Sequence, residues 1–282
     1  MATEISALRW ALKKTARKAL ALSTAGCEHA WRWAGKPVTA PVRVLTYHRF
    51  GAARRDPFCV RVEDFEQHMA WIAGHCDARS LADVTSIVGG QVQFTRPGVL
   101  VTIDDGLRSL YTEALPILQR YRVPAVAFVP AGEIGTASDE ARLSWNELRD
   151  LHQAGITIGS HGWVHRSLGR LSAAAVRDDM ERSRSAIEQR LGIRVSAFAY
   201  PFGTRADYNA VTEAVLRDSG YTCAFTSQHG AVRAGMNPFS LPRIKVEGGE
   251  DLWMFRLLCR GALDGWQWVD HTLWRLQASE RP

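Results

Sequence analysis

The sequence has few cysteines, and their spacing follows no recognisable pattern. Five cysteines occur among 282 residues, and no two of them form a C-x-x-C pair. A disulfide framework normally has an even number of cysteines, and a cysteine-ligated zinc site normally has closely spaced pairs. We therefore expect free thiols and a reducing compartment. The five residues are Cys27, Cys59, Cys76, Cys223 and Cys259.

A long apolar run is also lacking. No stretch approaches the roughly 20 apolar residues that a membrane-spanning helix needs. Residues 19–26 follow several basic residues but are few and only weakly apolar, so a cleaved signal peptide is not favoured. We expect a cytoplasmic protein, with a position at the membrane surface as the alternative.

No strong excess of one charge is present either. Lys and Arg number 35 and Asp and Glu 29, which gives a net charge of +6. The basic residues are spread along the chain and accompany no nucleic-acid-binding motif, so we do not expect a nucleic-acid partner. With 46% apolar and 23% charged residues, the chain has the composition of an ordinary globular protein with a full-sized core.

Residues 5–20 have the pattern of a basic amphipathic helix. One interpretation is a helix that packs on the rest of the protein. The other is a helix that lies on an anionic membrane, with Trp31 and Trp33 following it as interface aromatics. The sequence leaves both open. The apolar positions of this segment are Ile5, Leu8, Leu12 and Ala19, and its basic positions are Lys13, Lys14, Arg17 and Lys18.

From residue 42 onward, short apolar runs alternate with helical patterns over about 200 residues. Successive apolar positions within the runs indicate parallel strands that are covered on both faces. Gly155, Gly192 and Gly220 mark the ends of three helices. The expected strands are residues 42–47, 98–103, 124–129, 155–160, 195–200 and 221–226, and the expected helices are residues 62–75, 107–121, 144–155, 172–192 and 205–220.

This βαβα alternation fits a (β/α) barrel or an open, doubly wound sheet. Polar residues gather where the strands end: His48 follows the first, Asp104 and Asp105 the second, His161 a later one and Tyr200 another. Barrel enzymes build their active sites at the carboxyl ends of their strands. The barrel is therefore the favoured prediction.

Two of these strand ends carry a metal-binding pattern. "TIDDG" supplies Asp104 and Asp105, and "SHGWVH" supplies His161 and His165 at i,i+4 spacing. One carboxylate and two imidazoles leave coordination positions open for water, as catalytic metal sites do. Asp105 would bind the cation, and Asp104 would accept a proton beside it. The alternative is a solvated turn in which an Asp caps the next helix.

"TIDDG", "SHGWVH" and "AFAYPFG" resemble three motifs of the polysaccharide deacetylases of carbohydrate esterase family 4, also called the NodB-homology domain. The resemblance extends over about residues 42–246. It implies an α/β fold, a distorted (β/α) barrel of seven or eight strands. It also implies removal of acetyl groups, N-acetyl above all, from a carbohydrate with the help of a divalent metal ion, for which zinc is expected.

Carried over to this sequence, the resemblance assigns a role to each motif residue. Asp104 would be the general base, and Asp105, His161 and His165 would be the metal ligands. The backbone N–H of Phe202 would face the developing oxyanion. The expected substrate-binding residues are Trp163, Tyr200, Pro201, Phe202 and Gly203.

The sequence departs from the usual family pattern in two places. No arginine closely precedes "YPFG", and the late leucine-x-histidine motif is missing. The "YH" at the first strand and "LPRI" near the end resemble a subgroup in which these motifs are rearranged. There His48 would be the general acid, and Arg243 would pair with Asp104. The alternatives are a structural hydrogen bond for His48 and a barrel-closing salt bridge for Arg243.

The sequence thus predicts three parts: an N-terminal helical extension (residues 1–40), the barrel (residues 41–247) and a Trp-rich tail packed on it (residues 248–282). The predicted activity is metal-dependent deacetylation of a polysaccharide, an oligosaccharide or a glycan precursor. An amidase for a small non-sugar amide and an inactive carbohydrate-binding module remain as alternatives. Nothing in the sequence indicates the oligomeric state.

Overall fold

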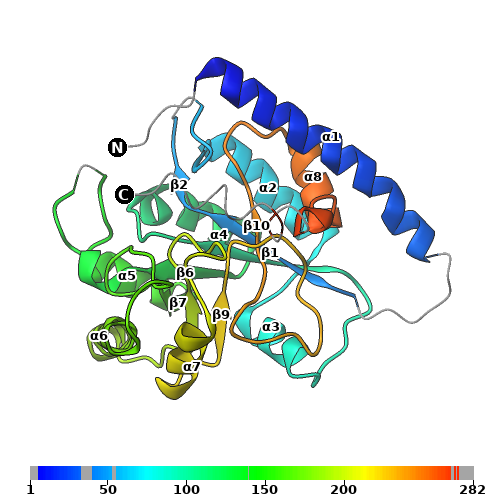
Figure 1. Cartoon of the computed structure of the whole chain (residues 1–282). Coiled ribbons are helices and arrows are strands. Elements are labelled where there is room, and N and C mark those ends of the chain that lie inside the picture. The colour runs from blue at the N-terminus through cyan, green and yellow to red at the C-terminus, as the bar shows by residue number, and fades with distance from the viewer. Residues whose placement is uncertain are drawn as a thin grey trace.

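The computed structural model describes residues 6–32, 40–52, 55–138 and 140–267, together with residues 270 and 272. Its centre is a parallel sheet in the order β10-β1-β5-β6-β7-β8-β9, with helices around it (Figure 1). The strands are β1 (Val42–Tyr47), β5 (Gly98–Ile103), β6 (Ala125–Val129), β7 (Thr157–Ser160), β8 (Ala197–Ala199), β9 (Cys223–Phe225) and β10 (Ile244–Lys245). The distorted (β/α) barrel that the sequence predicts is therefore confirmed.

The barrel closes through an irregular segment between β9 and β1. The N–H of Ala224 donates to the carbonyl of Pro238, and the N–H of Leu241 donates to the carbonyl of Ala224. β10 begins at Ile244, shortly after Leu241, and pairs with β1 in parallel, with Lys245 opposite Thr46. Residues 238–245 therefore span the gap that regular strands leave open, which makes the barrel a distorted one.

The strands are buried on both faces, as their continuous apolar runs predict. All six residues of β1 and all six of β5 are buried. Val44 and Leu100 belong to one apolar cluster, and the neighbouring Leu45 and Val101 belong to the other. Alternate side chains along each strand therefore fill two separate cores, one on each face of the sheet.

The predicted helices are present, and glycines end several of them. Gly155, Gly192 and Gly220 have positive φ angles of 92°, 70° and 83°, where a side chain would be strained. The helices are α2 (Val62–His75), α4 (Leu115–Tyr121), α5 (Trp145–Gln153), α6 (Ala173–Leu191) and α7 (Ala210–Asp218), with a π-helical turn (Leu110–Ala114) before α4.

Several short elements were not predicted. α3 (Leu81–Val88) is an eight-residue helix that begins with a capping box at Ser80. β4 (Asp77–Ala78) pairs with the first two residues of β5, and β2 (Arg49–Phe50) pairs with β3 (Cys59–Val60) in a small separate sheet. Elements of two to eight residues are too short to show a clear hydrophobic period.

The N-terminal helix α1 (Ala7–Arg32) packs against α8 (Leu252–Arg260) on the outside of the barrel (Figure 1). Of the two interpretations of this segment, the structure contains the packed helix. Leu8, Leu12 and Leu22 nevertheless remain exposed, at 72%, 63% and 58%. Ile5, Trp33 and the side chain of Trp31 lie outside the described residues.

Two further predictions concern the chain as a whole. Within the described ranges, no helix is long and apolar enough to cross a membrane. Cys59, Cys76, Cys223 and Cys259 are free thiols, as expected, whereas the side chain of Cys27 lies outside the described part.

Candidate active site

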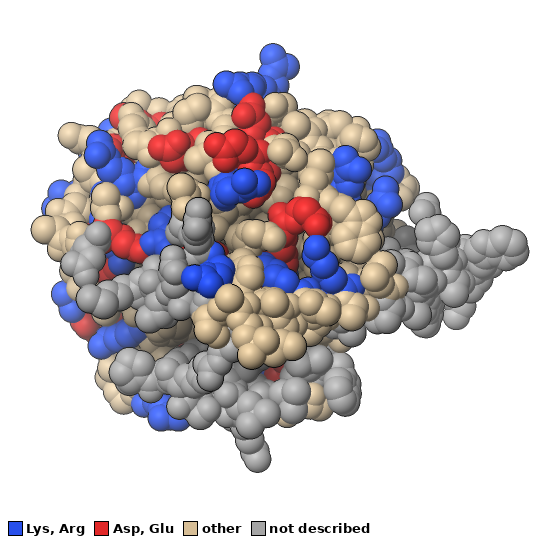
Figure 2. All heavy atoms as spheres, turned by 90° about the horizontal axis from the view of Figure 1, so that it is seen from above, with Lys and Arg blue, Asp and Glu red and all other residues tan. Residues whose placement is uncertain are grey.

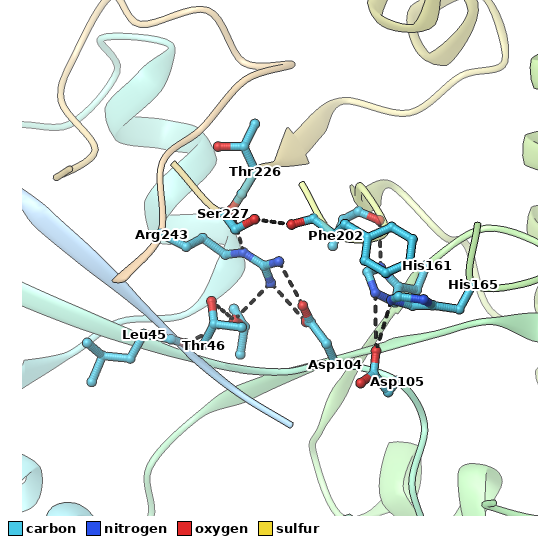
Figure 3. A network of polar contacts seen from close by, with 12 residues as sticks. Leu45, Thr46, Asp104, Asp105, His161, His165, Phe202, Thr226, Ser227 and Arg243 are labelled. Atoms are coloured by element: carbon cyan, nitrogen blue, oxygen red, sulfur yellow. Dashed lines mark hydrogen bonds and ion pairs between the residues drawn. The ribbon is translucent and has the colours of Figure 1, made fainter. Parts of the chain in front are cut away.

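Asp105, His161 and His165 form a cluster at the carboxyl ends of β5 and β7. The Nε2 atoms of both histidines lie 3.4 Å from Oδ1 of Asp105. The three candidate ligand atoms lie within 4.8 Å of one another, and Figure 3 shows both rings directed toward the carboxylate. Two imidazole nitrogens and one carboxylate oxygen are a typical donor set for catalytic zinc.

Two features of the cluster fit a divalent cation. Oδ1 of Asp105 is buried and makes no hydrogen bond among the described residues, which is costly for a carboxylate oxygen without a cation nearby. The Nδ1 of His161 lies 2.7 Å from the carbonyl oxygen of Ala199. Because a carbonyl only accepts, Nδ1 carries the proton, and the lone pair of the neutral ring is at Nε2, facing Asp105.

The turn after β5 separates the two adjacent aspartates. Asp105 and Gly106 have φ angles of 73° and 62°, in the left-handed region that Asp tolerates better than most residues. As a result, Asp104 points toward Arg243 and Asp105 points toward the histidines (Figure 3). Each carboxylate therefore has its own partner, which explains how two like charges can end one buried strand.

An ion pair that the sequence did not predict contacts the backbone of two of the candidate metal ligands. Arg142 donates to the backbone carbonyl of Asp105 at 2.5 Å and pairs with Glu133 at 2.6 Å. Glu133 accepts the backbone N–H of His165 at 2.7 Å. Glu133 closely follows β6, so its place after a strand end was a signal that could have identified it.

Asp104 and Arg243 form a bidentate ion pair in the barrel interior. The two guanidinium nitrogens lie 2.8 and 2.7 Å from the two carboxylate oxygens, and both side chains are buried. Arg243 also donates to Oγ1 of Thr102 and to the carbonyl of Thr226. Burial acts to raise the pKa of Asp104, but Arg243 and His161 outweigh it, and the pKa is lowered. Asp104 is therefore ionised at neutral pH.

His48 lies directly after β1, at the same end of the barrel. Its Nδ1 is buried without a hydrogen-bond partner among the described residues, and Phe58 packs edge-on against its ring at 5.0 Å. Burial lowers the pKa of His48 to about 4, although Asp105 and Asp104 act to raise it. The sequence left the sign of this shift open; burial lowers the pKa, so the ring is neutral at pH 7.

The third motif needs a correction. Tyr200 was expected to bind the substrate, but it is fully buried, its hydroxyl donates to the carbonyl of Phe239 and its ring stacks on Tyr208. Its side chain packs in one of the two apolar cores. Pro201 and Gly203 are buried as well.

Phe202 is the exposed member of this motif. It has a φ of 62° and is 43% exposed, and its ring packs edge-on against His165 at 4.5 Å. The hydroxyl of Ser227 donates to its carbonyl. Phe202 therefore presents an aromatic ring beside His165, a candidate metal ligand.

Trp163, which was expected to contact the substrate, is half-buried, and its ring also packs within the chain. It lies against Gly132, where a Cβ atom would overlap the indole. The guanidinium carbon of Arg182 lies 4.4 Å from the ring centroid. The backbone N–H of Trp163 donates to Asp179. These contacts hold the Trp163 ring in place between the two histidines, and its contact with the substrate stays a prediction.

The site and the fold agree with a comparison of the sequence with known families. Residues 91–224 match the sequence model of the polysaccharide deacetylase family. Residues 91–224 therefore form a polysaccharide deacetylase domain. The chain is accordingly a hydrolase that acts on carbon–nitrogen bonds other than peptide bonds, and the resemblance noted in the sequence is confirmed.

Individual proteins extend this similarity beyond the matched residues. The chain is 26% identical over 223 residues to YxkH of Bacillus subtilis, which is provisionally named a polysaccharide deacetylase. The match covers 78% of this chain and 76% of YxkH. The chain is 24% identical over 201 residues to the poly-β-1,6-N-acetyl-D-glucosamine N-deacetylase of Staphylococcus aureus, covering 67% and 68%. Its fold matches the deacetylase PplD of Streptococcus pyogenes with a TM-score of 0.70 at 22% identity, over 80% and 99% of the two chains.

Proposed function

We propose that this deacetylase depends on a divalent metal ion and removes N-acetyl groups from a polymer of β-1,6-linked N-acetylglucosamine. The observation that carries the proposal is the arrangement at one end of the barrel. There the cluster of Asp105, His161 and His165 lies next to the Asp104–Arg243 pair. The named activity of the Staphylococcus aureus relative supports the choice of substrate.

Asp105, His161 and His165 would hold the ion, and their donor set favours zinc. When bound, such an ion polarises a carbonyl group and lowers the pKa of water. Side chains of the protein orient the attacking water and transfer protons. Arg243 fixes the orientation of Asp104 through two hydrogen bonds and keeps it ionised, so that Asp104 can accept a proton from the attacking water.

His48 would provide a proton to the leaving nitrogen as the carbon–nitrogen bond breaks. The oxygen of water joins the acetyl carbon, so the products are acetate and a free amine. Burial keeps the His48 ring neutral before the reaction, and negative charge that develops nearby favours its protonated form. The attacking water would release this proton to Asp104, and His48 would take it up from there and pass it on to the leaving nitrogen.

Phe202 would act at the acetyl group and at the sugar. Its backbone N–H would donate to the carbonyl oxygen as negative charge builds up there. Its exposed ring, held against His165, offers an apolar face to a sugar ring. Together these contacts would place the acetyl group over the metal ligands.

Acetate release tests this function. The full chain is incubated with β-1,6-linked N-acetylglucosamine oligomers, with β-1,4-linked oligomers and with simple acetamides, each before and after treatment with a chelator. We expect release from the β-1,6-linked oligomers, loss of activity after chelation and recovery on addition of Zn²⁺. Preference for simple acetamides would favour a small-molecule amidase, and release that a chelator does not affect would exclude the metal.

We also propose that α1 brings the protein to a membrane surface from the cytoplasmic side. Support comes from the exposed Leu8, Leu12 and Leu22 on a long surface helix. Lys14 and Arg17 pair with acidic residues of the same chain, so their charges are largely neutralised. Burial of leucine side chains would therefore contribute more to binding than attraction to anionic lipid.

A further inference from the structure

Buried ion pairs connect α1 to the loop Glu247–Asp251, which follows β10. Arg17 is only 3% exposed; its Nε lies 2.8 Å from Glu250 and its Nη1 lies 3.5 Å from Glu247. Lys14 lies 3.2 Å from Glu247. Both glutamates are buried. If Lys14 and Arg17 lost their charges while α1 stayed in place, two neighbouring buried carboxylates would lack their cations, which is a strongly destabilising arrangement.

The same loop packs tightly against the backbone of residues 56–59. A Cβ atom at Gly248 would overlap the carbonyl oxygens of Asp56 and Cys59, so only glycine fits there. The N–H of Gly248 donates to the carbonyl of Pro57 at 3.3 Å. A displacement of the Glu247–Asp251 loop must therefore displace residues 56–59, which include Phe58.

Lys245 completes the connection from α1 to His48. Arg17 donates to the carbonyl of Lys245 at 3.0 Å. The Lys245 ammonium lies 3.3 Å from the ring centroid of Phe58, and Phe58 packs edge-on against His48. The backbone of Lys245 pairs with Thr46, two residues before His48. A continuous set of contacts thus runs from Arg17 through Lys245 and Phe58 to His48.

We propose that Arg17 is a positioning residue for the general acid His48. The proposal rests on the proposed function, because it takes His48 to be the proton donor. Arg17 contacts neither His48 nor the metal ligands. It fixes the carbonyl of Lys245 and neutralises the loop that supports Phe58, and so sets the place of the His48 ring. An error of about 1 Å in the place of a catalytic group can cost 10²-fold in rate.

The location of α1 is consistent with this role. α1 lies outside residues 91–224, which match the deacetylase family, and it joins α8 and the loop before it into one layer beside β10 (Figure 1). Acidic and basic side chains are interspersed over the face seen from above, without a large area of one charge (Figure 2). Lys14, Arg17 and Lys18 of α1 each pair with an acidic residue of the Glu247–Asp251 loop, and these ion pairs hold the layer together.

The test is a double-mutant cycle in the full chain between Arg17→Ala and His48→Ala. Turnover is measured on an N-acetylated β-1,6 oligomer and on an activated acetyl ester, whose leaving group needs little protonation. Metal content and thermal unfolding are measured in parallel. Lys18→Ala is the matched control, because Lys18 lies on the same helix but makes an exposed ion pair with Asp251.

We expect Arg17→Ala to lower turnover on the oligomer about ten- to a hundred-fold, with a much smaller loss on the ester and unchanged metal content. In the His48→Ala background it should cause no further loss. Arg17→Lys should recover part of the activity, and Lys18→Ala should keep it. If Arg17→Ala does not fold, Arg17→Lys takes its place in the same cycle.

Two results would overturn the proposal in different ways. If Arg17→Ala causes the same loss with and without His48, Arg17 acts on the general stability of the protein and positioning is excluded, while the proposed function stands. If His48→Ala alone keeps full turnover on the oligomer, His48 is not the acid, and both the acid assignment and the positioning role fail together.

Discussion

Arg243 binds both carboxylate oxygens of Asp104, at 2.7 and 2.8 Å, in the interior of the barrel where both side chains are buried. The pair joins β5 to the segment that closes the barrel, so it has a structural role beside the catalytic role that we propose for Asp104. An ionised carboxylate cannot remain in such a place without its cation. The two residues therefore have to be tested together.

Replacing one partner should cost more than replacing both. Arg243→Met leaves Asp104 buried and unpaired, and Asp104→Leu leaves Arg243 in the same condition, so each should lower the free energy of unfolding by about 3 kcal/mol. The double variant should recover part of this loss. Chemical denaturation of the three variants measures the coupling, and a double variant as unstable as the sum of the two would contradict it.

Asp104→Asn separates catalysis from metal binding. The amide keeps the size of the side chain but cannot accept a proton as a base, whereas Asp105, His161 and His165 are untouched. We expect normal zinc content with turnover reduced by about 10² to 10⁴. Near-normal turnover would show that Asp104 is not the base.

A buried histidine remote from the metal ligands should make the protein sensitive to acid. His68 is a residue of α2, and its ring stacks on Phe255 of α8 at 3.8 Å. Burial lowers the pKa of His68 to about 3. Because this pKa is below that of the unfolded chain, stability is present above about pH 6.5 and is lost as the pH falls, when the unfolded chain takes up the proton.

Between pH 6.5 and pH 4 this one residue should cost up to about 3 kcal/mol of stability. His68→Gln should flatten that part of the profile, and His75→Gln, at the partly exposed end of the same helix, is the matched control. Denaturation at a series of pH values gives the slopes. Equal slopes for the wild-type chain and His68→Gln would show that His68 does not cause the acid sensitivity.

Phe202→Ala should weaken substrate binding more than it slows the chemistry. Loss of an aromatic face that contacts a sugar costs about 1 kcal/mol, so KM for the oligomer should rise several-fold while kcat changes little. Val211→Ala, at another exposed apolar side chain, is the control. A fall in kcat with unchanged KM would instead assign the ring to holding His165 in place.

Vesicle binding by α1 can be tested without removing the helix. Deleting residues 1–35 would also expose Glu247 and Glu250, so the better variant replaces Leu8, Leu12 and Leu22 with Ser. This change should keep the fold and weaken binding to anionic vesicles, because less apolar surface enters the bilayer. Equal sedimentation of both proteins with vesicles would rule out a role for these leucines.

Local patterns in the sequence predicted the strands and the cluster of Asp105, His161 and His165. β1 and β5 have the predicted bounds because their apolar runs are continuous and sharply ended. Asp105 and His161 meet because parallel strands bring their carboxyl ends to one edge. These inferences need only the order of residues along the chain.

Other features depend on packing between distant segments. Tyr200 directly follows β8 and turns into the core, where it contacts Phe239 and Tyr208. The sequence of a three-residue strand does not show this orientation. The pair of Arg17 and Glu250 joins residues 233 positions apart. Neither orientation nor long-range pairing can be read from spacing alone.

The central claim is that Asp105, His161 and His165 bind the ion on which deacetylation depends. The most direct measurement is a titration of metal-free protein with Zn²⁺, following bound metal and acetate release from the N-acetylated β-1,6 oligomer together. The account predicts that both rise in proportion up to one equivalent, and that His161→Ala and His165→Ala show neither increase. Full acetate release by the metal-free protein, or zinc-dependent release by His161→Ala, would contradict it.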